Sequence, residues 1–175
     1  MQTKHVEVCP YDPAWVQDFL AIKSELKAAL GDFALQIEHV GSTSVEGLWA
    51  KPIIDIDVVV EDVSDLMVVI RSLSANGYTH EGNLGIDGRE AFKYQGKQHL
   101  RKHHLYVCQK DSVELKRHIT FRDYLRMHPK AVKEYSEVKR RGARLFLYDI
   151  DSYIEYKSSV IGKIYDQIAR AELEP

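Results

Sequence analysis

The stretch from residue 37 to residue 60 most constrains what this chain can fold into, because it places two apolar runs on either side of a glycine turn. The β-branched and apolar residues of these runs predict strands at 34–40 and 53–60. Gly41 follows the first run, and glycine tolerates the backbone angles of a sharp turn. The stretch therefore predicts a strand, a tight turn, a short helix and a second strand, in that order.

The turn has the features of a phosphate-binding site. A helix is predicted to begin at Ser42, because Ser42 and Thr43 are residue types that favour helix starts, and to end before Pro52. Free N–H groups and the positive dipole end of such a helix favour a phosphate above the turn. Gly41, Ser42 and Thr43 are therefore candidate phosphate ligands. Lys51 is either a further phosphate ligand or an ordinary exposed lysine.

Asp55 and Asp57 form a candidate metal and catalytic site. They are two residues apart in the second strand, so their side chains are predicted to leave the same face and to face the Gly41–Ser42 turn. Two carboxylates in one small volume repel each other unless a cation neutralises them. Mg²⁺, or Mn²⁺ in its place, takes one or two carboxylates together with substrate phosphate oxygens. The alternative is a surface turn followed by a strand with a polar face.

The motifs of this chain resemble those of a known family. Gly41-Ser42 followed by Asp55 and Asp57 is similar to the signature of the nucleotidyltransferase superfamily, whose fold is that of DNA polymerase beta. The strings H-V-G-S-T-S-V-E-G-L and A-K-P-I-I-D-I-D resemble the GrpB family more closely, as do G-R-E-A-F-K-Y, H-H-L-Y-V and F-R-D-Y-L-R-M-H-P. The resemblance covers nearly the whole chain. It implies a nucleotidyltransferase-like fold and, as the predicted activity, transfer of a nucleotidyl group from an NTP.

The resemblance also implies a third carboxylate on a neighbouring strand, which this chain lacks. The strand predicted at 103–108 contains no acid, and from His104 it reads H-L-Y where GrpB-like sequences typically have His-x-His. His104 and Tyr106 are predicted to share a face. His104 is a candidate catalytic base, because histidine titrates near neutral pH, or else a half-buried histidine bonded to backbone. Glu90 and Glu114 are the nearby acids that could replace the missing carboxylate.

Charged residues elsewhere add candidate phosphate ligands. Arg89 and Lys93 open a predicted hairpin and are either phosphate ligands or solvated charges, and Lys157 is a weaker candidate of the same kind. The net charge is only −2, but residues 97–145 carry 14 Lys and Arg against 5 Asp and Glu. This excess fits solvated helix faces or a phosphate-rich partner. No nucleic-acid recognition motif accompanies it, so nucleic acid is not the favoured partner.

The remaining segments predict an α+β fold. Apolar residues at helical spacing predict helices on one face of a mixed sheet of about five strands. The chain is predicted to be a single domain, 1–175, in which residues 111–175 form a helical C-terminal part. The other predicted elements are an edge strand at 4–8, helices after Pro13 and at 66–73, strands at 78–81, 89–95 and 103–108, and helices from Pro129 and from Asp149 or Asp151.

The composition indicates the class of protein and its cellular compartment. The chain is 45% hydrophobic and 29% charged, which is typical of a globular protein rather than a disordered one. No apolar run approaches the roughly 20 residues that span a bilayer, and the N-terminus lacks the apolar core of a signal peptide. Cys9 and Cys108 are too few for a disulfide framework. We therefore expect a cytoplasmic protein with reduced cysteines.

These observations leave alternative functions open. The first is a Mg²⁺-dependent nucleotidyltransferase that uses an NTP and an unknown acceptor. The second is a non-catalytic nucleotide- or phosphometabolite-binding module, because the third carboxylate is missing. Some GrpB-like domains are fused to dephospho-CoA kinase, so the resemblance also implies coenzyme A metabolism as a context. The oligomeric state is left open by the sequence.

Overall fold

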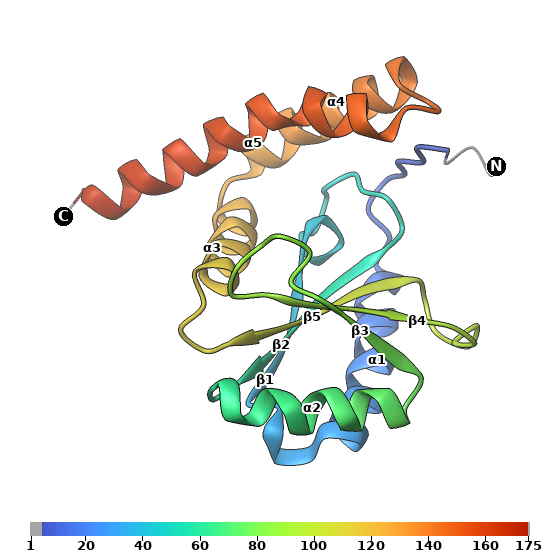
Figure 1. Ribbon diagram of the computed structural model, residues 1–175. Helices are drawn as coiled ribbons and strands as arrows, with labels where there is room; N and C mark the ends of the chain where they lie inside the picture. Colours follow the sequence, from blue (N-terminus) through green and yellow to red (C-terminus); the bar gives the residue numbers. More distant parts are fainter. Residues whose placement is uncertain (1–4, 175) are drawn as a thin grey trace.

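A computed structural model describes residues 5–174 as a mixed five-stranded β-sheet with helices on both sides (Figure 1). The strands are β1 (Gln36–Val40), β2 (Ile54–Val60), β3 (Tyr78–Gly82), β4 (Glu90–Tyr94) and β5 (His103–Gln109). Their order across the sheet is β1-β2-β5-β4-β3. β2 and β5 run parallel at the centre, and every other neighbouring pair is antiparallel. The predicted α+β class is confirmed.

Within residues 5–174, five α-helices and two one-turn 3₁₀ segments accompany the sheet. They are α1 (Ala14–Leu30), α2 (Val63–Ala75), α3 (Val113–Met127), α4 (Pro129–Leu145), α5 (Ile150–Leu173), η1 (Gly31–Phe33) and η2 (Ser42–Ser44). The last helix is capped by Asp149, whose carboxylate accepts from the Ser152 N–H at 3.1 Å. Within residues 5–174, no helix combines the length and the apolar character needed to cross a membrane.

The main core lies between one face of the sheet and helices α1 and α2. β2 alternates, so that Ile54, Ile56 and Val58 point into this core and are fully buried. The predicted apolar stripe of α1 packs against them, with Trp15 and Ile22 among the most buried side chains. Burying each such side chain contributes roughly 1.5–3 kcal/mol. This packing fixes which way the intervening residues of β2 point, and those residues include both acids.

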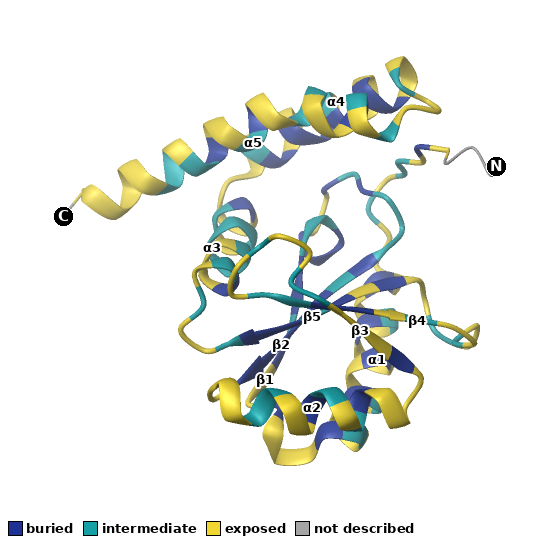
Figure 2. Cartoon of the chain, in the orientation of Figure 1, coloured by how far each residue is buried: buried dark blue, intermediate teal, exposed yellow. Residues whose placement is uncertain are grey.

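The opposite face of the sheet is only partly covered. α3 packs against one end of it through Leu115, which contacts Val59 and Cys108. The other end, next to η2, lies beneath the α4–α5 pair (Figures 1 and 2). The two helices approach closely at Gly142, where a Cβ would come within 2.8 Å of Tyr156. The C-terminal helices α4 and α5 therefore cover part of the sheet face that carries the two acids.

Two sequence predictions need correction. The helix predicted between Ser42 and Pro52 is only the one-turn segment η2, because Val45 is already extended and Gly47 has a φ of +81°. A helix dipole therefore does not act at this turn. The edge strand predicted at 4–8 is absent from residues 5–8, and the nearest pairing is an isolated bridge between Cys9 and Ala50. Lys4 lies outside the described residues.

Candidate functional site

The glycine turn lies directly over Asp55. Val40 pairs with Asp55 across β1 and β2, so the chain leaves β1 at the level of this acid. Gly41 has a φ of +71°, and a Cβ there would lie 2.2 Å from the Asp55 Oδ2 atom and 2.9 Å from the Asp55 Cβ. Only glycine leaves room for the carboxylate at this point. The turn and the first acid thus meet as the sequence predicted.

This close approach predicts a large stability cost for Gly41→Ala. Gly41 has a φ of +71° and a ψ of −173°, angles that cost a non-glycine residue about 1–3 kcal/mol, and the clash with Asp55 adds about 1–3 kcal/mol. Gly96→Ala is the matched control, because Gly96 has a φ of +73° and open space around it. Denaturant unfolding should show the larger loss for Gly41→Ala. Equal losses in the two variants would contradict the predicted contact with Asp55.

Buried hydrogen bonds hold the turn in place. His39 donates from Nε2 to the Thr43 hydroxyl at 2.9 Å, and that hydroxyl donates to the Ile53 carbonyl at 3.4 Å. The Ser44 hydroxyl donates to the Gly41 carbonyl at 2.5 Å. Burial lowers the pKa of His39 to about 4, so this imidazole is neutral at physiological pH. The His39 ring and the Thr43 hydroxyl are thus engaged in holding the backbone of the turn.

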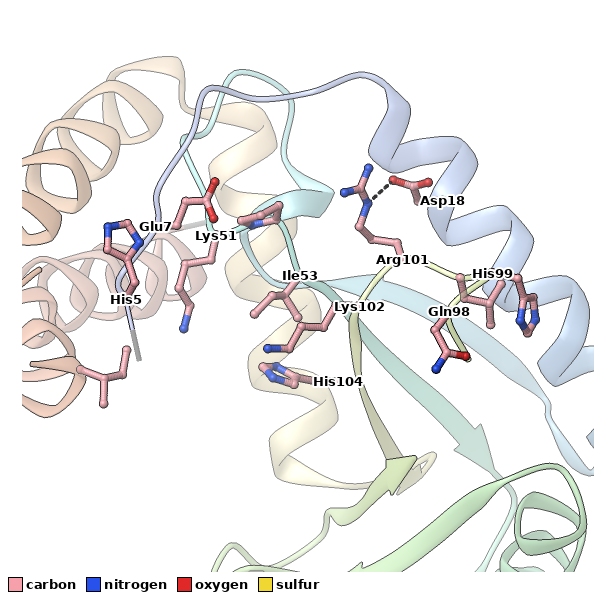
Figure 3. Close-up of a pocket in the computed structure, with 13 residues that line it drawn as sticks. His5, Glu7, Asp18, Lys51, Ile53, Gln98, His99, Arg101, Lys102 and His104 are labelled. Carbon is pink, nitrogen blue, oxygen red and sulfur yellow. Dashed lines mark hydrogen bonds and ion pairs between the residues drawn. The ribbon is translucent and has the colours of Figure 1, made fainter. Parts of the chain in front are cut away.

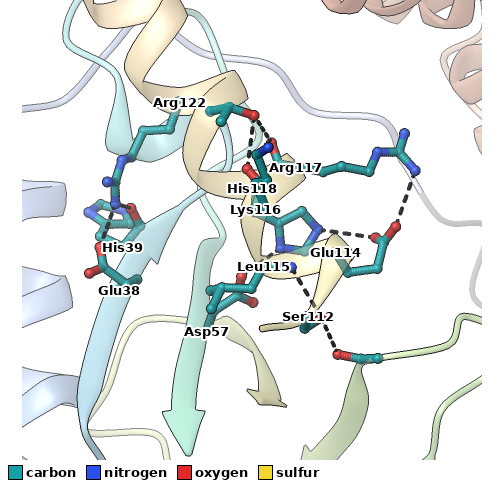
Figure 4. Close-up of polar contacts among 12 residues, drawn as sticks. Glu38, His39, Asp57, Ser112, Glu114, Leu115, Lys116, Arg117, His118 and Arg122 are labelled. Carbon is teal, nitrogen blue, oxygen red and sulfur yellow. Dashed lines mark hydrogen bonds and ion pairs between the residues drawn. The ribbon is translucent and has the colours of Figure 1, made fainter. Parts of the chain in front are cut away.

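Arginines of α3 clamp the backbone on both sides of the turn. Arg122 donates from one Nη atom to Glu38 at 2.7 Å and to the His39 carbonyl at 3.1 Å (Figure 4). Arg126 donates two hydrogen bonds to the Ser44 carbonyl, from Nε at 3.0 Å and from Nη2 at 2.8 Å. Part of the positive charge of residues 97–145 is therefore used inside the protein, to fix the turn.

Asp57 lies two residues further along β2, and a histidine covers its carboxylate. Its side chain is fully buried, and its Oδ2 atom accepts from Nδ1 of His118 on α3 at 2.6 Å (Figure 4). Glu114 lies 3.7 Å from the other nitrogen of the same ring. Burial raises the pKa of the Asp57 carboxyl. Burial alone would lower the pKa of His118, but the hydrogen bond and the charge of Asp57 outweigh it, so the pKa of His118 is raised. Both shifts favour the protonated forms of the pair.

Asp55 has a histidine partner of its own. His104 Nδ1 lies 2.9 Å from Asp55 Oδ1, and the two residues are paired in register across β2 and β5. Because the carboxylate accepts, Nδ1 carries the hydrogen and Nε2 is left as the acceptor nitrogen of the neutral ring. The predicted face is confirmed for both acids and for His104 and Tyr106, since Asp57 is in register with Tyr106.

The acid pair offers two candidate ligands for a hard divalent cation. Asp57 Oδ1 is buried without a hydrogen-bond partner in the described chain, and Asp55 Oδ2 lies directly against the Gly41 turn. Each carboxylate thus has one oxygen bonded to a histidine, and the second oxygen of Asp57 is unpartnered within the described residues. Within residues 5–174 no cluster of three or more His, Cys, Asp or Glu is arranged to hold a metal. The two acids match Mg²⁺, which takes one or two carboxylates and completes its shell with phosphate and water oxygens.

A small basic pocket adjoins Asp55. It has a volume of about 110 Å³, and its lining includes three lysines, Lys51, Lys139 and Lys157, together with Ser42. The ammonium of Lys139 is buried and donates to the Ser42 hydroxyl and, at 3.1 Å, to the Trp49 carbonyl. Burial lowers the pKa of Lys139 well below its ordinary value and that of Lys157 to about 8, with a further contribution from Lys51 at Lys157.

The other sequence candidates lie around this centre. The Arg89 guanidinium stacks 4.2 Å from the centre of the Tyr106 ring, and its buried Nε has no partner in the described chain. Lys93 pairs with Glu81 at 3.8 Å and does not line the basic pocket. Glu90 is in register with Val107, which points into the main core, so it lies on the face opposite Asp57. Arg89 is thus brought to the site, whereas Lys93 and Glu90 are not.

Sequence reasoning missed the partner of Asp57. His118 was not a candidate, although it lies four residues after Glu114 on one helix face, a spacing that brings the two side chains together. Lys139 lies in the densest basic run of the chain, and nothing in that run distinguishes it from its exposed neighbours. Its burial follows only from the packing of α4 on the turn.

The sheet and the position of its acids define a nucleotidyltransferase-like fold. Among solved structures, the Cid1 poly(U) polymerase with MgGTP bound matches with a TM-score of 0.53 at 11% identity, over 74% of this chain and 42% of that chain. A likeness at this identity concerns the fold alone. It agrees with the fold that the sequence motifs predicted.

The chain belongs to the GrpB family, whose model, described as "GrpB protein", matches residues 5–167. The crystal structure of conserved protein GrpB from Enterococcus faecalis matches with a TM-score of 0.84 and 36% identity, over 96% of this chain and all of that one. UPF0157 protein YqkA of Bacillus subtilis strain 168 is 36% identical over 90% of this chain. This chain spans only 46% of YqkA.

A further relative carries an enzyme name. A dephospho-CoA kinase of Mycolicibacterium paratuberculosis is 28% identical over 87% of this chain, which spans 43% of that protein. The similarity therefore concerns less than half of the kinase.

Proposed function

We propose that the chain transfers a nucleotidyl group from an NTP to a hydroxyl-bearing acceptor, with Mg²⁺ or Mn²⁺ as cofactor. The observation that carries this proposal is the position of Asp55, directly beneath the Gly41 turn and beside a pocket lined by three lysines. Carboxylates next to lysines suit a triphosphate that arrives with a divalent cation, because the acids hold the metal and the lysines offset the remaining phosphate charge.

The residues of the site divide the chemistry between them. Ser42, Lys139 and Lys157 bind the terminal phosphates, and Asp55 and Asp57 are the metal ligands. The cation, when bound, neutralises phosphate charge and polarises the α-phosphate. His104 accepts the acceptor's hydroxyl proton at Nε2. The hydroxyl oxygen bonds to the α-phosphorus while the bond from that phosphorus to the bridging oxygen breaks, and pyrophosphate leaves toward the lysines.

His118 has a defined part in this proposal. It covers Asp57 and holds one of its oxygens, so Asp57 reaches the metal only through its unpartnered Oδ1 atom. Arg89, stacked on Tyr106 beside the acids, is placed to offset additional phosphate charge.

A second candidate function is favoured by one observation. Tyr106 is in register with Asp57 on the neighbouring strand, where the resemblance calls for a third carboxylate. A pocket without that acid suits a non-catalytic module for nucleotides or phosphometabolites. The dephospho-CoA kinase relative makes coenzyme A metabolism a context for either function.

Ligand binding and turnover together test the proposal. Thermal unfolding with each of the four NTPs, with and without Mg²⁺, should show a metal-dependent rise in melting temperature for at least one, since a ligand that binds only the folded state stabilises it. Pyrophosphate release is then measured with that NTP and candidate acceptors. No stabilisation by any NTP would refute nucleotide binding. Stabilisation without pyrophosphate release would favour the module.

The lysine pocket predicts that NTP affinity falls as pH rises. Lys157 has a pKa of about 8 and attracts phosphate only when protonated, so its contribution is nearly complete about one pH unit below 8, is halved near pH 8 and is lost as the pH rises further. We expect the dissociation constant to rise by up to about tenfold per pH unit above 8. Calorimetry between pH 7.5 and 9.5 measures this in wild type and in Lys157→Gln. A variant that keeps the wild-type pH profile would contradict the assignment.

A further inference from the structure

A second and larger cleft adjoins the basic pocket. It has a volume of about 880 Å³ and shares Lys51, Ile53 and His104 with the smaller pocket (Figure 3). The rest of its wall comes from Pro52 before β2, the N-terminal segment, α1, the loop before β5 and the start of α5. Sites for small molecules typically have volumes of about 300–1,000 Å³. The cleft is therefore large enough for a metabolite and opens directly onto His104.

The end of the cleft away from His104 is electrically balanced. Arg101 donates from Nε to Asp18 at 2.8 Å, which uses the charge of both side chains. His99, which lines the cleft, is hydrogen-bonded to Glu25, which does not. These paired groups leave little net charge to attract an ion at that end.

The end beside His104 contains two lysines and one acid, Glu7, which lies next to Lys51 (Figure 3). Lys51, Lys102 and His104 gather there around Ile53 (Figure 3). Lys102 is exposed, and its ammonium has no hydrogen-bond or ion-pair partner within residues 5–174. Glu7 is the one acid of the lining that is not paired with an arginine. An anionic group is therefore best accommodated between the two lysines, with a hydroxyl of the same molecule directed toward the acceptor nitrogen of His104.

The lining lacks the large aromatic rings on which nucleobases most often stack. It contains no Phe, Tyr or Trp among the residues that the structure describes. Single-stranded nucleic acid is usually held by aromatic side chains on which its bases stack. This cleft has instead aliphatic, amide, imidazole and charged groups, which suit a small polar molecule.

We propose that this cleft is the acceptor site and that the acceptor is a small phosphorylated metabolite. Its phosphate lies between Lys51 and Lys102, and its hydroxyl faces His104. The role of the bound molecule as acceptor rests on the proposed function, whereas its binding in the cleft does not. The two are therefore tested in separate titrations.

The test uses backbone amide NMR spectra of the full chain without NTP or metal. The probes are glucose 6-phosphate and glycerol 3-phosphate, with glucose and glycerol as uncharged controls. We expect the phosphorylated probes alone to shift the amides of residues 98–104. Lys102→Gln should weaken their binding about tenfold, because a charge-assisted hydrogen bond is lost. Lys133→Gln, which removes an exposed lysine on α4, should leave it unchanged.

Three results would overturn the proposal. They are the absence of shifts at residues 98–104 with both phosphorylated probes, equal shifts with the uncharged controls, and tighter binding of a hexauridylate at the same residues. A parallel titration with an NTP and Mg²⁺ follows the amides of residues 41–43. Shifts with the phosphorylated probes but not with the NTP would support metabolite binding in the cleft and contradict nucleotidyl transfer. Shifts with the NTP alone would contradict metabolite binding in the cleft.

Discussion

Replacing Asp55 and Asp57 together by asparagine is expected to abolish Mg²⁺-dependent NTP binding and to lower turnover by at least about 10²–10³-fold. Removing preorganised charge at a phosphoryl-transfer site costs this much or more, and here both candidate metal ligands are lost at once. Asparagine keeps the shape of the side chain and an oxygen that can accept from His104 and from His118. The fold should therefore survive, which unfolding measurements would verify.

Calorimetric titration of an NTP with Mg²⁺ present measures the effect. Glu137→Gln with Glu155→Gln is the matched control, because it removes the same charge from exposed positions on α4 and α5. The control should bind like wild type. If the Asp55/Asp57 variant also binds like wild type, the metal role of these acids is wrong.

His104→Ala is expected to leave NTP binding nearly intact while turnover falls by about 10²–10⁴-fold, the usual cost of losing a general base. The reason lies in the Asp55–His104 hydrogen bond, which fixes the ring and leaves Nε2 as the acceptor facing the large cleft. Pyrophosphate release measures turnover, and calorimetry measures binding. Added imidazole should restore part of the lost rate, which a purely structural histidine would not allow.

His80→Ala is the matched control for this prediction. His80 also bonds a carboxylate, with its Nε2 atom 2.6 Å from Glu90, but outside the site. That variant should keep wild-type turnover. If His104→Ala changes neither binding nor turnover, the histidine is structural, and Glu114 becomes the next residue to test. Glu90 is a weaker choice, because it lies on the opposite face of the sheet.

Local patterns in the sequence were enough to predict most of the fold. The two-residue period of a strand placed Asp55 and Asp57 on one face, because the apolar residues between and beside them had to enter the core. The helical stripe that begins at Trp15 predicted α1 in the same way. The length of the helix after Gly41 was wrong, because a positive φ at Gly47 and the extended Val45 depend on how the turn packs.

The sequence by itself determined the turn, the acid pair and the face they share, since these depend on neighbours a few residues apart. Only the tertiary structure decided which partners those acids have. His118 reaches Asp57 from 61 residues away, and Lys139 reaches Ser42 from 97 residues away. Such contacts depend on how α3 and α4 pack across the sheet. Local periodicity carries no information about that packing, because an exposed lysine and a buried one can occupy the same helical pattern.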